Sequence, residues 1–124
     1  PVVMPLHPRT KNYLATQKIL LNVHAIDPVG YFDMLSLLEN CRLVLTDSGG
    51  LQKEAYFFGK FCITLREQTE WLELVKEGVN EVAGFDKDRI LASVDKNINA
   101  RIGNRPLYGS GDAAQKIADK LKTF

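Results

Sequence analysis

The segment TDSGGLQKEA, residues 46–55, holds the groups best suited to bind a ligand. It follows the apolar run 43–45, so it begins where a buried strand should end. Ser48, Gly49 and Gly50 open the helix expected next, where the first N–H groups have no internal partner and the helix dipole is positive. Such a helix start favours anions, phosphate above all. We interpret this turn as a candidate phosphate-binding site.

Glu54 lies four residues after Gly50, on the same face of the expected helix. Its carboxylate would repel a phosphate but would accept hydrogen bonds from neutral hydroxyls, such as those of a ribose. The segment therefore predicts a nucleotide site, with phosphates on the turn and sugar hydroxyls on Glu54. The alternative is a plain helix start, capped by Asp47 or Ser48, in which the glycines only make a tight turn. The pattern is neither a Walker loop nor GxGxxG, so it identifies no particular nucleotide by itself.

The elements that must position this turn alternate between short apolar runs and helical patterns. We expect strands at residues 2–6, 23–26, 43–46, 62–65 and 79–83. Helical patterns cover residues 10–21, 31–38, 51–58, 71–77, 90–98 and 114–121, the last with Asp112 as its cap. This regular β/α alternation predicts a parallel sheet with helices on both faces. Ligands bind beyond the carboxyl ends of the strands in such sheets, and the candidate turn lies at one of those ends.

The composition of the 124-residue chain is that of a globular domain, with 45% hydrophobic and 25% charged residues. A formal net charge of +1 without a long basic run disfavours nucleic acid and anionic membranes as partners. No apolar stretch approaches the roughly 20 residues of a membrane span. Cys41 and Cys62 stand beside apolar runs and are interpreted as buried, reduced thiols. We expect a cytoplasmic protein without a metal or other cofactor.

The segment TDSGGLQKEAYFFGKFCITLREQTEW resembles the signature of the non-hydrolysing UDP-N-acetylglucosamine 2-epimerases. The segments MPLHPRT, DPVGYFDMLSLL and RPLYGSGDAAQKI are similar to further family motifs, in the expected order and spacing. The resemblance covers essentially the whole chain. It implies two Rossmann-like domains in the glycosyltransferase-B arrangement, with the active site between them. Residues 1–124 would then form one incomplete UDP-binding Rossmann-like domain, without the N-terminal domain and the first β-α unit.

The resemblance also implies an activity. The family interconverts UDP-N-acetylglucosamine and UDP-N-acetylmannosamine by eliminating UDP, exchanging the C2 proton and adding UDP back. A helix start that stabilises charge on the departing diphosphate suits that step. The family's histidine segment and its proton-transferring acids have no counterpart in this chain, so we expect no catalytic residue here. The chain would supply the UDP-binding half and be inactive alone.

The resemblance assigns roles residue by residue. The serine and glycines of the turn match the diphosphate-binding segment, and Glu54 matches the carboxylate that binds the ribose. The Val29 backbone and the Met34 side chain match the segment beside uracil, where an aromatic residue is more usual than methionine. These six residues are the UDP-binding site that we expect.

Three further residues are candidate contacts. Trp71 stands where some family members carry an arginine that contacts the nucleotide, and a tryptophan cannot supply that charge. Arg66 follows a strand and would either meet phosphate or order the site. His7 lies near a strand end, but a lone histidine before a proline is more often structural than catalytic.

The missing first strand has a structural consequence. In the order 3-2-1-4-5-6, its absence leaves the second and fourth strands, residues 2–6 and 43–46, facing a gap. Unpaired strand edges need partners. We expect these two strands to pair directly, or to exchange with a second molecule in a homodimer.

Two other functions remain open. A glycosyltransferase of the same architecture would also bind UDP with a glycine-rich helix start and a glutamate, although the SGG, QKEA and TLREQTEW segments together favour the epimerase. A non-catalytic UDP-binding module is the second alternative. Relatives that hydrolyse the nucleotide sugar differ in residues outside this half, so the chain does not separate them.

Overall fold

Five short parallel strands, each followed by a helix, form the fold of the computed structural model, which describes residues 1–103 and 106–123. The strands are β1 (Val3–Pro5), β2 (His24–Ile26), β3 (Leu43–Thr46), β4 (Phe61–Thr64) and β5 (Asn80–Val82). The helices are α1 (Pro8–Thr16), α2 (Tyr31–Asn40), α3 (Gly49–Phe57), α4 (Leu72–Lys76), α5 (Lys87–Asn97) and α6 (Ala113–Leu121). The predicted α/β class, with parallel strands flanked by helices, is confirmed.

The described strands form two ladders. β1 pairs with β2, with Val3 opposite His24, and the other ladder has the order β3-β4-β5, with Leu43 opposite Phe61. Each ladder lies within one part of the chain, so direct pairing of residues 2–6 with residues 43–46 stays a prediction. Exchange with a second molecule stays a prediction. The chain correspondingly divides into two compact units, Pro1–Asn40 and Cys41–Phe124, which are described separately.

The first unit holds β1, α1, β2 and α2. Leu6 is buried, and its N–H extends the ladder by donating to the Ile26 carbonyl at 2.9 Å. His7 occupies the N-cap of α1, and its Nδ1 accepts a hydrogen bond from the Arg9 N–H at 3.2 Å. Leu38 supplies the buried side chain of α2. This unit is therefore organised by one short ladder and two helices with few buried residues.

The first helix ends earlier than predicted. α1 stops at Thr16, because Lys18 adopts a left-handed backbone with a φ of 53° and its N–H donates to the Ala15 carbonyl. Leu20 is 95% exposed, so it does not continue an apolar helix face. The extension to Leu21 was wrong because the backbone turns before the apolar residues that suggested it.

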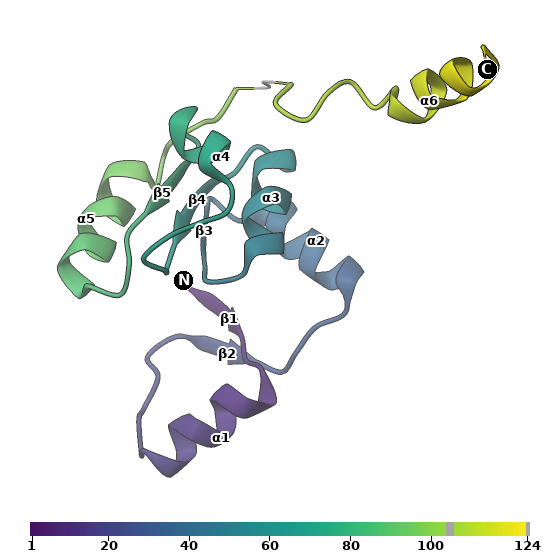
Figure 1. Cartoon of the computed structure of the whole chain (residues 1–124). Helices are drawn as coiled ribbons and strands as arrows, with labels where there is room; N and C mark the ends of the chain where they lie inside the picture. Colours follow the sequence, from purple (N-terminus) through teal and green to yellow (C-terminus); the bar gives the residue numbers. More distant parts are fainter. Residues whose placement is uncertain (104–105, 124) are drawn as a thin grey trace. The chain divides into compact units, whose positions relative to one another are not determined.

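The core of the second unit lies on both faces of the β3-β4-β5 sheet. Phe61 and Ile63 of β4 and Ala83 are buried together, and Ile90 and Val94 of α5 pack against them. α3 lies on the opposite side of this sheet in Figure 1. Side chains alternate across a strand, so Cys62 and Thr64 of β4 face α3. The α5 side of the sheet is thus apolar, whereas the α3 side carries buried polar groups such as Thr64 beside apolar ones such as Cys62.

The last helix begins at the predicted place but without the predicted side-chain cap. Asp112 occupies the N-cap of α6, yet its carboxylate makes no capping hydrogen bond. It pairs instead with Lys116 Nζ at 2.9 Å, and this bond lowers the pKa of Asp112. Arg105, the first residue of the motif RPLYGSGDAAQKI, lies outside the described residues.

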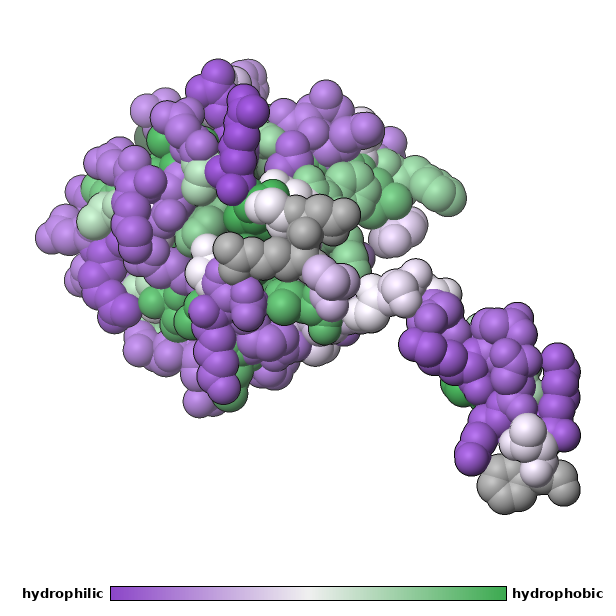
Figure 2. All heavy atoms as spheres, turned by 90° about the horizontal axis from the view of Figure 1, so that it is seen from above, coloured by the Kyte–Doolittle hydropathy of each residue, from purple (hydrophilic) through white to green (hydrophobic). Residues whose placement is uncertain are grey.

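The two cysteines form no disulfide. Cys62 is buried, and burial raises the pKa of its thiol to about 12, while half-buried Cys41 also has its pKa raised by burial. Hydrophilic side chains cover most of the face seen in Figure 2. Across the described residues no helix has the length and apolar character to cross a membrane, and no cluster of acidic, histidine and cysteine side chains could hold a metal.

Two leucines of α4 give a direct test of this core. Leu74 is fully buried, whereas Leu72 on the same helix is 59% exposed. We expect Leu74→Ala to lower the free energy of unfolding by about 2–5 kcal/mol, because it removes buried methyl groups and leaves a cavity. Leu72→Ala should change it by no more than about 0.5 kcal/mol. Urea denaturation of both variants measures the difference, and equal effects would contradict this core.

Candidate functional site

The candidate turn follows β3 directly and leads into α3. Ser48 occupies the N-cap with an extended backbone, φ −80° and ψ 127°, but its side chain makes no capping hydrogen bond. Its own N–H donates to Thr46 Oγ1 at 3.0 Å. The Ser48 hydroxyl therefore does not satisfy the first N–H groups of α3, which have no intrahelical acceptor. Ser48 thus takes the N-cap position that a plain helix start predicts, but without the side-chain hydrogen bond of such a cap.

Another side chain comes very close to Gly49. A Cβ at this position would overlap Glu70 Oε1 and would approach the indole nitrogen of Trp71. A Cβ at Gly50 would meet only the Ser48 hydroxyl, at 4.0 Å. The first glycine thus makes room for Glu70, and the second lies beside open space.

Trp71 holds the turn from outside. Its indole N–H donates to the Gly49 carbonyl at 2.8 Å, and its backbone N–H donates to Thr69 Oγ1 at 3.2 Å. The structure thus places this candidate residue directly against the glycine turn. Trp71 contributes a neutral donor to the backbone and no charge, so its contact orients the turn.

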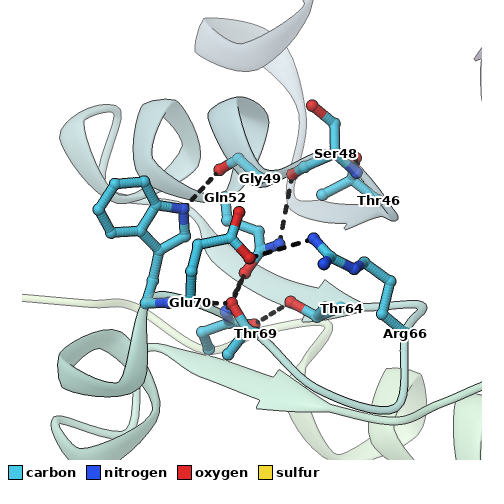
Figure 3. Close-up of polar contacts among 10 residues, drawn as sticks. Thr46, Ser48, Gly49, Gln52, Thr64, Arg66, Thr69 and Glu70 are labelled. Atoms are coloured by element: carbon cyan, nitrogen blue, oxygen red, sulfur yellow. Dashed lines mark hydrogen bonds and ion pairs between the residues drawn. The ribbon is translucent and has the colours of Figure 1, made fainter.

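Gln52 holds the same turn from inside. This fully buried side chain donates from Nε2 to the Ser48 carbonyl at 3.3 Å. Its Oε1 accepts from Thr69 Oγ1 at 2.6 Å and from Asn80 Nδ2 at 3.0 Å. Thr64 Oγ1 donates in turn to Asn80 Oδ1 at 2.9 Å. One amide therefore joins the turn, the loop after β4 and the strand β5, as the dashed lines of Figure 3 partly show.

Arg66 and Glu70 form an ion pair beside the turn. Arg66 Nη1 lies 3.1 Å from Glu70 Oε2, and the two side chains are 38% and 49% exposed. Figure 3 shows these side chains pointing toward each other, with Ser48 and Gly49 close by. The pair brings one positive and one negative charge to the start of α3.

An aromatic cluster lies further along α3. The Tyr108 hydroxyl donates to Glu73 Oε1 at 2.8 Å, and Lys53 Nζ lies 4.1 Å from the centre of the Tyr108 ring and 4.4 Å from that of Trp71. Burial, followed by the bond to Glu73, raises the pKa of Tyr108, so the phenol remains a donor. The motif around Tyr108 therefore packs against α3 and α4.

Glu54 lies on α3, one turn beyond the glycines, and is half-buried. Its backbone carbonyl accepts the Phe58 N–H at 3.0 Å. Its carboxylate has no protein donor among the described residues. This side chain is consequently available to accept hydrogen bonds from a ligand.

The other three sequence candidates belong to the first unit. Val29 and Met34 are half-buried, and the Met34 N–H donates to the Gly30 carbonyl at 3.0 Å as α2 begins. His7 serves as the N-cap of α1, which agrees with its structural reading. Phe32, which the sequence analysis did not single out, is 83% exposed on the same helix as Met34.

Sequence reasoning also missed Gln52, Thr69 and Glu70. The spacing of Gln52 was one indication of its role. It is a polar residue one helical turn after Ser48, between the apolar positions Leu51 and Ala55. Glu70 carried none, because its contact with Gly49 joins positions far apart in the chain.

Removing the Gln52 amide should weaken the whole second unit. In Gln52→Leu, the buried Thr69 hydroxyl and the buried Asn80 amide nitrogen lose their acceptor, and each unsatisfied buried group costs about 1–3 kcal/mol. We expect the free energy of unfolding to fall by at least about 2 kcal/mol, measured by urea denaturation. The matched control Gln115→Leu, on exposed α6, should change it by no more than about 0.5 kcal/mol. An equal loss in both variants would contradict the role of Gln52.

Comparisons with known proteins agree with this geometry. A Pseudomonas aeruginosa UDP-2,3-diacetamido-2,3-dideoxy-D-glucuronate 2-epimerase is 50% identical over 98% of the chain, and a Methanocaldococcus jannaschii UDP-N-acetylglucosamine 2-epimerase is 36% identical over 94%. The chain spans 34% and 33% of these relatives, about a third of their length.

Solved structures show the same likeness. The M. jannaschii enzyme in complex with UDP-N-acetylglucosamine and UDP superposes with a TM-score of 0.81 at 34% identity, covering 98% of this chain and 35% of that one. Staphylococcus aureus MnaA with UDP gives 0.77 at 30% identity, covering 97% and 35%. These neighbours are of the glycosyltransferase-B type. The sequence profile described as UDP-N-acetylglucosamine 2-epimerase matches residues 1–122, and the chain belongs to that family.

Proposed function

We propose that this chain is the UDP-binding part of a UDP-N-acetylglucosamine 2-epimerase, which interconverts UDP-N-acetylglucosamine and UDP-N-acetylmannosamine. The observation that carries the proposal is the start of α3, where Ser48 leaves the first N–H groups without a side-chain cap. Support comes from the M. jannaschii relative, whose matching structure was solved with UDP-N-acetylglucosamine and UDP. Ser48, Gly49 and Gly50 would hold the diphosphate at this helix start.

The remaining candidate residues would contact the ribose and the uracil of the nucleotide. The Glu54 carboxylate, one turn along α3, would accept hydrogen bonds from the ribose hydroxyls. The Val29 backbone and the Met34 side chain would lie beside uracil. Trp71 would fix the turn through the Gly49 carbonyl while the ligand is bound.

The chemistry places one demand on this site. Elimination removes the C2 proton and breaks the bond between the anomeric carbon and the phosphate oxygen, so the bonding electrons leave with UDP. A preorganised helix start stabilises that negative charge and keeps UDP in place until the bond re-forms on the C2 epimer. The groups that move the proton would come from other parts of the polypeptide, and this chain contributes no catalytic residue.

A second substrate is favoured by one comparison. The relative with 50% identity is named as an epimerase of UDP-2,3-diacetamido-2,3-dideoxy-D-glucuronate, whereas the M. jannaschii relative named for UDP-N-acetylglucosamine is 36% identical. Both names describe inversion at C2 of a UDP-linked sugar. The UDP-binding role is the same for either substrate, so only the sugar distinguishes the two.

A homodimer and a cytoplasmic location also belong to this proposal. The outer strands of the β3-β4-β5 ladder would support pairing with a second copy.

Chimeric enzymes can test the proposal. We would replace the matching third of the P. aeruginosa and M. jannaschii relatives with residues 1–122, and incubate each chimera with its parent's substrate in D₂O. We expect deuterium at C2 and formation of the C2 epimer, both followed by NMR. Each unmodified relative serves as the positive control. A folded chimera that binds UDP but incorporates no deuterium in either background would contradict the epimerase assignment.

Removal of the Glu54 carboxylate should weaken UDP binding in particular. We expect Glu54→Ala to raise the calorimetric dissociation constant for UDP about tenfold, since charged hydrogen bonds to the ribose are lost. Binding of 2′,3′-dideoxy-UDP should be unaffected, because this ligand lacks those hydroxyls. The control Asp95→Ala, at an exposed position of α5, should leave UDP binding unchanged. Equal losses for both nucleotides would contradict the ribose contact.

A further inference from the structure

The chain places one of its own carboxylates at the start of α3. Glu70 Oε1 occupies the space that a Cβ on Gly49 would need, and Arg66 Nη1 lies 3.1 Å from Glu70 Oε2. Figure 3 shows the Glu70 carboxylate among Gly49, Ser48 and Arg66. An acidic group is stabilised near a helix N-terminus by the dipole. The Glu70 carboxylate therefore occupies a position that favours an anion.

A diphosphate and Glu70 would compete for this position. Two negative charges a few ångströms apart repel each other, and the repulsion grows where protein replaces water. The Glu70 side chain can move away from the start of α3, because it is 49% exposed and Arg66 is its one ion-pair partner among the described residues. The glycine turn cannot leave, since Gln52 and Trp71 hold it from both sides.

Resting on the UDP-binding function above, we propose that Glu70 is a displaceable stand-in for the diphosphate. In the unliganded chain Glu70 covers Gly49 and holds Arg66. When the diphosphate binds, Glu70 moves off the turn and Arg66 transfers its hydrogen bond from Glu70 to a phosphate oxygen. Arg66 thereby becomes a diphosphate-binding residue.

The chemistry of Arg66 fits this exchange. Its guanidinium has five N–H donors in a planar fork, and the ion pair with Glu70 uses one of its nitrogens. The same fork matches phosphate as well as carboxylate. Trp71 supplies no charge, whereas Arg66 brings a positive charge to this end of α3 through its ion pair with Glu70.

Charge removal at Glu70 provides the first test. Glu70→Gln keeps the shape of the side chain and removes its charge, so we expect the calorimetric dissociation constant for UDP to fall about fivefold in the 124-residue chain and in the P. aeruginosa chimera. Uridine, which lacks the diphosphate, should bind both forms equally. Glu67→Gln is the matched control, because Glu67 is in the same loop but its carboxylate lies beside Gly84. This control should leave UDP binding unchanged.

Arg66 provides the second test. We expect Arg66→Gln to raise the UDP dissociation constant about tenfold, and the loss should persist when Glu70→Gln is also present. Trp71 is the chain's single tryptophan, so its fluorescence reports in the 124-residue chain whether the turn stays formed in each variant.

The outcomes separate the inference from the function on which it rests. If neither the chain nor the chimera binds UDP in its unsubstituted form, the proposed function fails. This inference fails if UDP binds the unsubstituted protein but Glu70→Gln either raises the UDP dissociation constant or gives the same value as Glu67→Gln. Glu70 would then not compete with the diphosphate. If Arg66→Gln loses affinity only while Glu70 is intact, Arg66 acts on Glu70 alone and its transfer to phosphate is overturned.

Discussion

The side-chain amide of Gln52 is the constraint on which the second unit depends. Both polar atoms of a buried amide need hydrogen-bond partners, and those of Gln52 come from three separate segments. It fixes the Ser48 carbonyl at the end of β3, Thr69 in the loop after β4 and Asn80 in β5. The polar face of the sheet is therefore as specific as the apolar face beneath α5.

The candidate site follows from that constraint. With the turn held inside by Gln52 and outside by Trp71, the backbone N–H groups that open α3 point out of the helix without a serine cap. Electrostatics then decide what can lie there: the dipole favours negative charge, and Glu70 is the negative charge that the chain itself provides. Preorganisation of this kind costs little when a ligand arrives, since only one exposed side chain has to move.

Local sequence patterns were sufficient to predict much of the fold and the glycine turn. Apolar runs predicted all five strands, and α3 ends at Phe57, one residue before the predicted end, with Gly59 following at a φ of 66°. The glycine turn and its place after β3 could also be predicted, because both depend on neighbouring residues. The contacts of Gly49 with Glu70 and of Gln52 with Asn80 could not, because they join segments that only tertiary packing brings together. The end of α1 at Thr16 was missed because apolar spacing carries no information on a left-handed residue such as Lys18.

The contact between Gly49 and Glu70 also links two positions in the evolution of the chain. As long as the acid rests on the turn, position 49 accepts no side chain, since even one methyl group would overlap the carboxylate. A substitution at either position changes which residues the other can tolerate. A residue larger than glycine at position 49 would therefore push the acid off the turn, so the side chain at one position sets where the side chain at the other lies.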